Sequence, residues 1–162
     1  MDKILIRIAT IVICVLLSPT GQTKVDPPNY NFGLDVLDPF KPGSTLEQIK
    51  AKYGDGEVVG KAGAVEGRKY YVAHIRYKFP VFVQFFEGKV VDTYATLPKY
   101  FLHDLFHQSL INRYGKQAQY GRKDGTAQYV WDKDGVRHTY EGACTITCFP
   151  MYYSMQLLPM PK

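Results

Sequence analysis

The fold is decided by the stretch LEQIKAKYG, Leu46 to Gly54, and by its partner HQSLINRYG, His107 to Gly115, which lies 61 positions further on. Each stretch carries apolar residues at helical spacing and ends on the same Tyr-Gly pair, and glycine commonly follows the last residue of a helix. A Leu-Pro pair at Leu97 and another at Leu158 repeat at the same interval. Self-similarity at a fixed period indicates a repeated structural unit.

We therefore expect two repeat units, residues 42–98 and residues 99–159, within one domain that covers residues 42–162. In each unit a helix precedes antiparallel strands, whose apolar residues alternate or run continuously between turn residues. The first helix is expected to begin at Ser44, with Glu47 completing a capping box. The fold class is thus α+β, with both units forming one continuous or concave sheet and the helices on one side. The alternative is a cystatin-like or cone-shaped single sheet around one helix.

Residues 1–21 have the three-part pattern of a secretory signal peptide. Lys3 and Arg7 supply the positive flank, an apolar run extends from Ile8 to Leu17, and small or helix-breaking residues follow at Ser18 to Gly21. The apolar run is shorter than the ~20 residues that span a bilayer. We expect cleavage, no transmembrane anchor afterwards, and a location outside the cytoplasm, either periplasmic or fully secreted. An uncleaved anchor is the alternative.

Beyond the signal peptide the charge is modest and the first segment is rich in proline. Residues 22–162 carry a net charge of +4. The charges are scattered, which excludes the clustered basic footprint of a nucleic-acid-binding protein. Residues 22–41 are expected to form a loose leader, because proline prevents regular strand pairing. Four apolar side chains would pin this leader to the domain surface: Phe32, Leu34, Leu37 and Phe40.

Two cysteines, Cys144 and Cys148, remain after cleavage. Four steps along a regular strand span ~13 Å, whereas a disulfide requires Cα atoms within ~7 Å. Either this segment bends at a bulge or turn, or both cysteines are buried free thiols. We favour a local disulfide, because the secreted context permits one.

The sharpest candidate for chemistry is the pair His103 and His107, which share one helix face at a spacing that suits zinc. Zinc needs at least three protein ligands, and His74 and His138 lie elsewhere in the chain. We therefore predict no catalytic residue and no cofactor. A metal-dependent hydrolase using His103 and His107 is the alternative.

A sheet face with aromatic and cationic side chains is the expected binding site. In the expected strand at residues 68–78, alternation places one such set opposite Tyr71, Ile75 and Tyr77. The expected members of the site are Tyr70, His74, Arg76, Lys78, Tyr129, Trp131 and Tyr140. Aromatic residues and arginine are enriched in protein interfaces. We expect a non-enzymatic binding protein whose partner is another extracytoplasmic protein.

The stretch PGSTLEQI at residues 42–49, followed by Tyr53-Gly54, resembles the opening of the SmpA/OmlA outer-membrane lipoprotein domain. Residues 85–91, FFEGKVV, look like the strand-turn-strand ending of that domain. Two such units in tandem resemble the architecture of β-lactamase inhibitor proteins. The resemblance implies an α+β fold and a binding role, as an inhibitor or an envelope-assembly accessory. A third possibility is an envelope-surface protein that its positive charge holds on anionic lipid or glycan.

Overall fold

The computed structural model describes residues 33–144 and 148–161 of the chain. The expected signal peptide at residues 1–21 and the first part of the expected leader lie outside the described residues. Within the described part, no helix combines the length and the apolar content that crossing a membrane requires.

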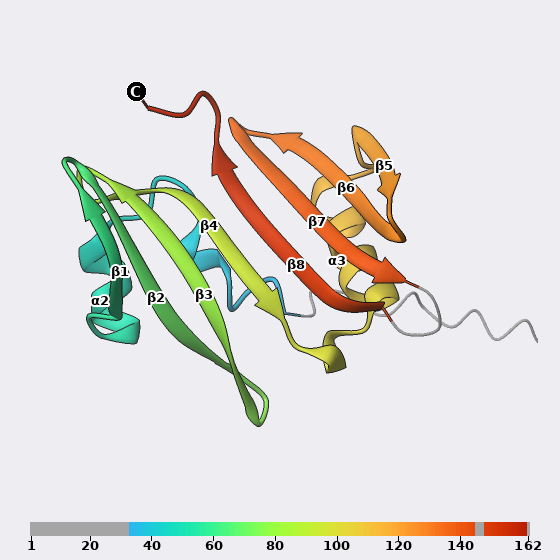
Figure 1. Cartoon of the computed structure of the whole chain (residues 1–162), viewed down its shortest axis with the longest axis horizontal. Coiled ribbons are helices and arrows are strands. Elements are labelled where there is room, and N and C mark those ends of the chain that lie inside the picture. The colour runs from blue at the N-terminus through green and yellow to red at the C-terminus, as the bar shows by residue number, and fades with distance from the viewer. Residues whose placement is uncertain (1–32, 145–147, 162) are drawn as a thin grey trace, which may run out of the picture.

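The described chain forms a single eight-stranded antiparallel sheet with two α-helices (Figure 1). Helix α2 (Leu46–Tyr53) precedes four strands: β1 (Glu57–Ala62), β2 (Val65–His74), β3 (Tyr77–Phe86) and β4 (Lys89–Leu97). Helix α3 (His103–Tyr114) precedes the other four: β5 (Gln119–Lys123), β6 (Thr126–Lys133), β7 (Val136–Cys144) and β8 (Cys148–Leu157). Short 3₁₀ turns, η1 (Asp38–Phe40) and η2 (Lys99–Phe101), come before the two helices.

The strand order is β1-β2-β3-β4-β8-β7-β6-β5, so β4 and β8 pair in the middle of the sheet while β1 and β5 form its edges. This confirms the predicted α+β class with one antiparallel sheet. The cystatin-like alternative has one helix, whereas this sheet carries two.

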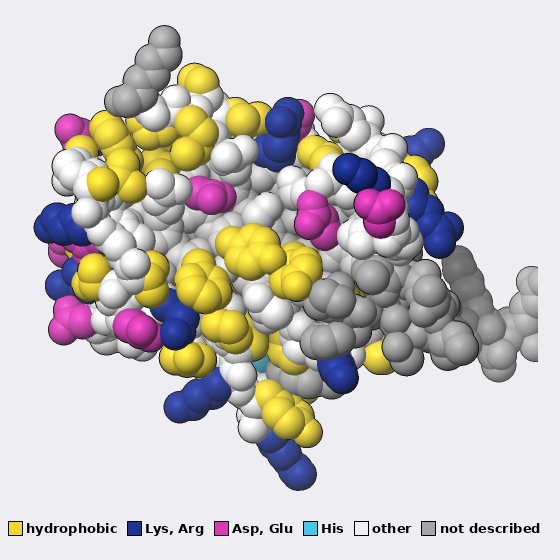
Figure 2. All heavy atoms as spheres, in the orientation of Figure 1, with side chains coloured by type: hydrophobic (Ala, Val, Ile, Leu, Met, Phe, Trp, Pro, Cys, Tyr) yellow, Lys and Arg dark blue, Asp and Glu magenta, His cyan; other side chains and the backbone are white. Residues whose placement is uncertain are grey.

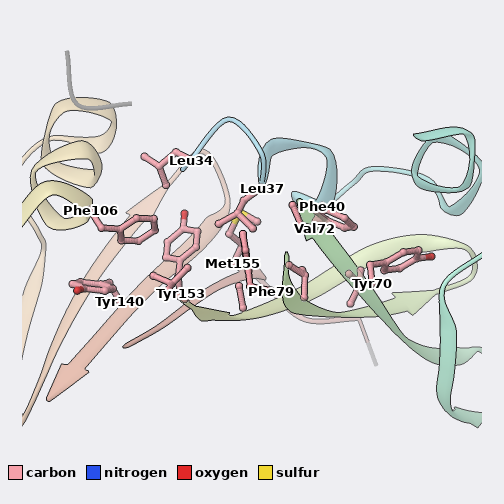
Figure 3. Close-up of a cluster of buried hydrophobic side chains, with 14 of the residues drawn as sticks. Leu34, Leu37, Phe40, Tyr70, Val72, Phe79, Phe106, Tyr140, Tyr153 and Met155 are labelled. Carbon is pink, nitrogen blue, oxygen red and sulfur yellow. The ribbon is translucent and has the colours of Figure 1, made fainter. Parts of the chain in front are cut away.

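Both helices lie on the same side of the sheet, which we call the inner face (Figure 1). The opposite side, the outer face, carries no helix in the described chain. The core therefore lies between the inner face and the helices. It is lined from the sheet by residues that include Tyr70, Val72, Phe79, Tyr140, Tyr153 and Met155 (Figure 3).

The segment at residues 34–40 fills the space between the two helices, where Figure 3 shows Leu34, Leu37 and Phe40 pointing at the sheet. Leu34 and Leu37 are 1% exposed and Phe40 is 0% exposed. The hydroxyl of Thr93 donates to the carbonyl oxygen of Phe40 at 2.6 Å. This part of the chain is core, and the expectation of a surface leader up to residue 41 is wrong here. Proline prevents strand pairing but does not prevent burial, and the apolar side chains recur every third residue.

The first helix begins one residue later than predicted, with Thr45 as its cap. The Gln48 backbone N–H donates to the Thr45 hydroxyl at 3.2 Å, and the Gln48 side chain accepts from the Thr45 N–H at 2.9 Å. The capping box is thus present, but Thr45 and Gln48 form it in place of Ser44 and Glu47.

The two cysteines occupy opposite positions on two paired strands. Cys144 ends β7 and Cys148 begins β8, and their backbones are direct register partners. Cys144 and Cys148 therefore lie on two paired antiparallel strands and not along one regular strand. Opposite residues in an antiparallel pair have Cα atoms about 4.5–5.5 Å apart, which lies within the range that a disulfide needs.

The disulfide remains a prediction with a direct test. We expect the native protein to resist alkylation at Cys144 and Cys148 until it is reduced. Reduction should lower the free energy of unfolding by about 2 kcal/mol, as expected for closing a loop of about five residues. Mass spectrometry counts the alkyl groups added to the native protein and to the reduced protein, and the difference between the two counts reports the disulfide. Alkylation of both thiols in the native protein would show that they are free.

Candidate binding face

The predicted strand at residues 68–78 is two strands, because the chain turns at Ile75 and Arg76 between His74 and its partner Tyr77. Tyr70 and Val72 point to the inner face, whereas Tyr71 and Ala73 point outward.

The predicted binding set does not form one surface. The expectation of exposure is wrong for Tyr70 (2% exposed), Trp131 (2%) and Tyr140 (0%), which belong to the core. Alternation separates the two faces of a strand but does not say which one the helices cover.

The other members of that set are scattered. The His74 ring packs on the inner side at 5.0 Å from the Phe101 ring. Half-buried Tyr129 packs 4.1 Å from the His107 ring beneath α3. Arg76 is exposed in the hairpin turn, and Lys78 is exposed on the outer face opposite Ala73.

The two helical histidines pack against tyrosines. The Nδ1 atom of His103 lies 2.9 Å from the Tyr140 hydroxyl, and the His103 and His107 rings stack at 5.4 Å. Burial lowers the pKa of both imidazoles. His138 lies apart from them in contact with Tyr153, with Nδ1 2.8 Å from the hydroxyl. Among the described residues, no three His, Cys, Asp or Glu side chains are grouped to hold a metal ion.

The outer face carries a different set of aromatic residues on β2, β3, β4 and β8. Phe82 and Tyr94 are register partners and are 37% and 38% exposed. The rings of Tyr94 and Tyr152 stack at 5.4 Å. Tyr71 is 57% exposed, and the Lys69 ammonium group lies 5.2 Å from its ring centre. We call Tyr71, Phe82, Tyr94 and Tyr152 the aromatic face.

Figure 2 shows hydrophobic side chains gathered in the middle of the outer face, over β3, β4 and β8. Polar pairs lie beyond them on the second half of the sheet. The Arg137 guanidinium binds Asp132 at 2.8 Å, and the Gln128 amide donates to Glu141 at 2.5 Å. An apolar centre with a polar surround is the usual anatomy of a protein interface.

A groove of about 420 Å³ lies beside the aromatic face, between β1 and the Phe82 and Tyr94 rings. Strand β1 bulges between Val58 and Gly60 along this groove. Gly67 lines this groove, and a Cβ atom there would crowd Val59, because it would lie 3.2 Å from Val59 Cγ2.

One acidic side chain lines this groove. Asp92 is half-buried, with Gln84 on β3 and Gln156 on β8 as its register partners. Burial raises the pKa of its carboxyl group, and a hydrogen bond from the Thr93 backbone N–H offsets part of that rise.

The run from Pro80 to Glu87 is apolar on both faces, which predicts a central or covered strand, so the aromatic face was not predicted. The structure covers only the inner side of β3, so Phe82 is left at the surface. A strand that is apolar on both faces marks either a buried strand or an exposed apolar patch. The apolar residues on both faces of this strand were therefore the signal in the sequence that could have indicated an exposed aromatic surface.

Comparison with known proteins gives no relative for this face. No protein-family model matches the chain, and no curated protein or solved structure matches it either.

Proposed function

We propose that the protein is a non-enzymatic extracytoplasmic binding protein, exported by its signal peptide, that presents the aromatic face to another protein. The observation that carries this proposal is a group of aromatic rings on the outer side of central strands, where no described helix covers them. Phe82 and Tyr94 are exposed there, and the ring of Tyr152 stacks on that of Tyr94. A few residues carry most of the binding energy of a protein interface, and tyrosine is enriched among them. Aromatic side chains lose little conformational entropy on binding, because each has two side-chain torsions.

The sheet suits this role because it holds the rings rigidly. Each ring projects from a strand that pairs on both sides, and the core of Phe79, Val81 and Tyr153 lies directly behind. A partner would therefore meet a preorganised surface, which reduces the entropic cost of association. An inhibitor or an envelope-assembly accessory would use such a surface.

The two halves are, in our proposal, tandem units resembling the arrangement in β-lactamase inhibitor proteins. Each half has a helix that ends on Tyr-Gly and four antiparallel strands after it. Gly54 and Gly115 both follow the helix with positive φ, 75° and 82°. The last strands of the halves, β4 and β8, pair with each other and build the centre of the outer face.

The test is affinity capture of partners from the extracellular or envelope fraction of the source cells. We expect the double variant Tyr94→Ser/Tyr152→Ser to recover a specific partner at least about tenfold less than the native protein, because two central aromatic contacts are lost. The matched control is Glu47→Ser/Lys116→Ser, which changes two exposed residues away from the outer face and keeps the net charge. Equal recovery by both variants would contradict the proposal.

A further inference from the structure

We propose that the groove beside the aromatic face is a socket for one basic side chain, a lysine or arginine of the protein partner, and that Asp92 receives its charge. This inference rests on the proposed function and specifies the chemistry of the partner.

The groove is large enough to admit a side chain. Its volume of about 420 Å³ is near the lower end of ligand pockets, which span about 300–1,000 Å³. Val59 on β1 lines one end of the groove, Asp92 and Tyr94 on β4 line the other end, and Phe82 on β3 lies between them. Gly67 also lines the groove, and a Cβ atom there would crowd Val59.

Asp92 lacks a positive partner in the described chain. No Lys, Arg or His among the described residues forms an ion pair with Asp92. The hydrogen bond from the Thr93 backbone N–H offsets part of the cost of burying its charge. Lys61 also lines the groove, but its ammonium group pairs with Glu66 at 3.4 Å. A half-buried carboxylate without a counter-charge is unfavourable, so a cation is the occupant that its surroundings favour.

The walls favour a lysine or arginine over a compact amine. The aliphatic part of either side chain can pack against Phe82 and Tyr94 while the charged end reaches Asp92, which shares strand β4 with Tyr94. The faces of Phe82 and Tyr94 attract cations as well. Such a socket directly beside the aromatic face would add charge selectivity to an interface whose affinity comes from the rings.

The test uses two short peptides, acetyl-Leu-Arg-Leu-amide and the same peptide with citrulline, a neutral isostere of arginine. Titration of the isotope-labelled protein by NMR follows the backbone resonances of Val59, Gly67 and Gln84. We expect the arginine peptide to shift these resonances saturably and to bind at least about fivefold more tightly than the citrulline peptide. Asp92→Asn should abolish that preference, whereas Asp134→Asn, which removes a carboxylate from the exposed β6–β7 turn, should keep it.

A second readout concerns the free protein. Because burial of the carboxylate opposes folding at neutral pH, Asp92→Asn should raise Tm by about 1–3 °C. Equal binding of the two peptides, no shift at the groove, or a lower Tm in Asp92→Asn would overturn the socket. If capture still depended on Tyr94 and Tyr152 in that case, the aromatic face would stand without it.

Discussion

Replacing Phe40 with alanine is expected to lower the free energy of unfolding by about 3–5 kcal/mol, as for other fully buried phenylalanines. Its side chain is 0% exposed, and its ring centre lies 4.8 Å from that of Tyr53 and 5.5 Å from that of Tyr70. It thereby joins three separate parts of the chain: the segment before α2, the end of α2 and strand β2. The substitution would leave a cavity at that junction.

Urea unfolding at neutral pH measures the loss, and Ile75→Ala is the control. Ile75 is 72% exposed at the β2–β3 turn, so its truncation should change stability by less than about 0.5 kcal/mol. A loss below about 1 kcal/mol in Phe40→Ala would show that residues 34–40 are peripheral, as the sequence alone suggested.

The second large effect is the loss of stability in mild acid to which His138 contributes. Burial, with a smaller contribution from the charge of Arg113, lowers the pKa of His138 from 6.5 to about 4. The side chain is 6% exposed, and its ring stacks on Tyr114 at 4.0 Å. The folded protein therefore holds this imidazole neutral at a pH where the unfolded chain would protonate it.

The direction of the change in stability with pH follows from the difference between the pKa values of His138 in the folded and unfolded states. At pH values above 6.5 both states are neutral and stability is unaffected; as pH falls from 6.5 towards 4, the unfolded state gains a proton first and stability is lost. A shift of this size corresponds to about 3 kcal/mol. His103 and His107 act in the same direction, because burial lowers their pKa values too.

Urea unfolding of the native protein and of His138→Gln at pH 7 and pH 4 measures this contribution. The variant cannot titrate at this position. Between pH 7 and pH 4 its free energy of unfolding should therefore fall by about 3 kcal/mol less than that of the native protein, whatever the stability of the variant at pH 7. Equal losses in the two proteins would contradict the assignment to His138.

Local signals predicted the elements well. The Tyr-Gly pairs ended both helices, at Gly54 and Gly115. The residues Asp132 to Gly135 have the composition of a hairpin turn. The structure has a hairpin there, with Asp134 and Gly135 at positive φ between paired Lys133 and Val136. These features depend on a few neighbouring residues, so the sequence contains what is needed to find them.

The site was harder to predict because it depends on long-range packing. Tyr70 and Tyr71 are adjacent, and only the position of the helices and of residues 34–40 decides that the first is buried and the second exposed. The helical pattern from about Lys99 to Tyr114 predicts one helix, but the structure divides this stretch at Leu102, whose φ of 49° separates η2 from α3. Phe101 on one side of that break is fully buried against Phe79, a contact that no local pattern reveals.

The most direct test of the central claim is site-specific photo-crosslinking in the source cells. A photoreactive phenylalanine analogue would replace Tyr94 on the outer face and, in a control, Glu47 on α2. The aromatic face as a binding surface predicts a discrete protein adduct from position 94 and none of that mass from position 47. An adduct from position 47 alone, or no adduct from either position, would contradict it.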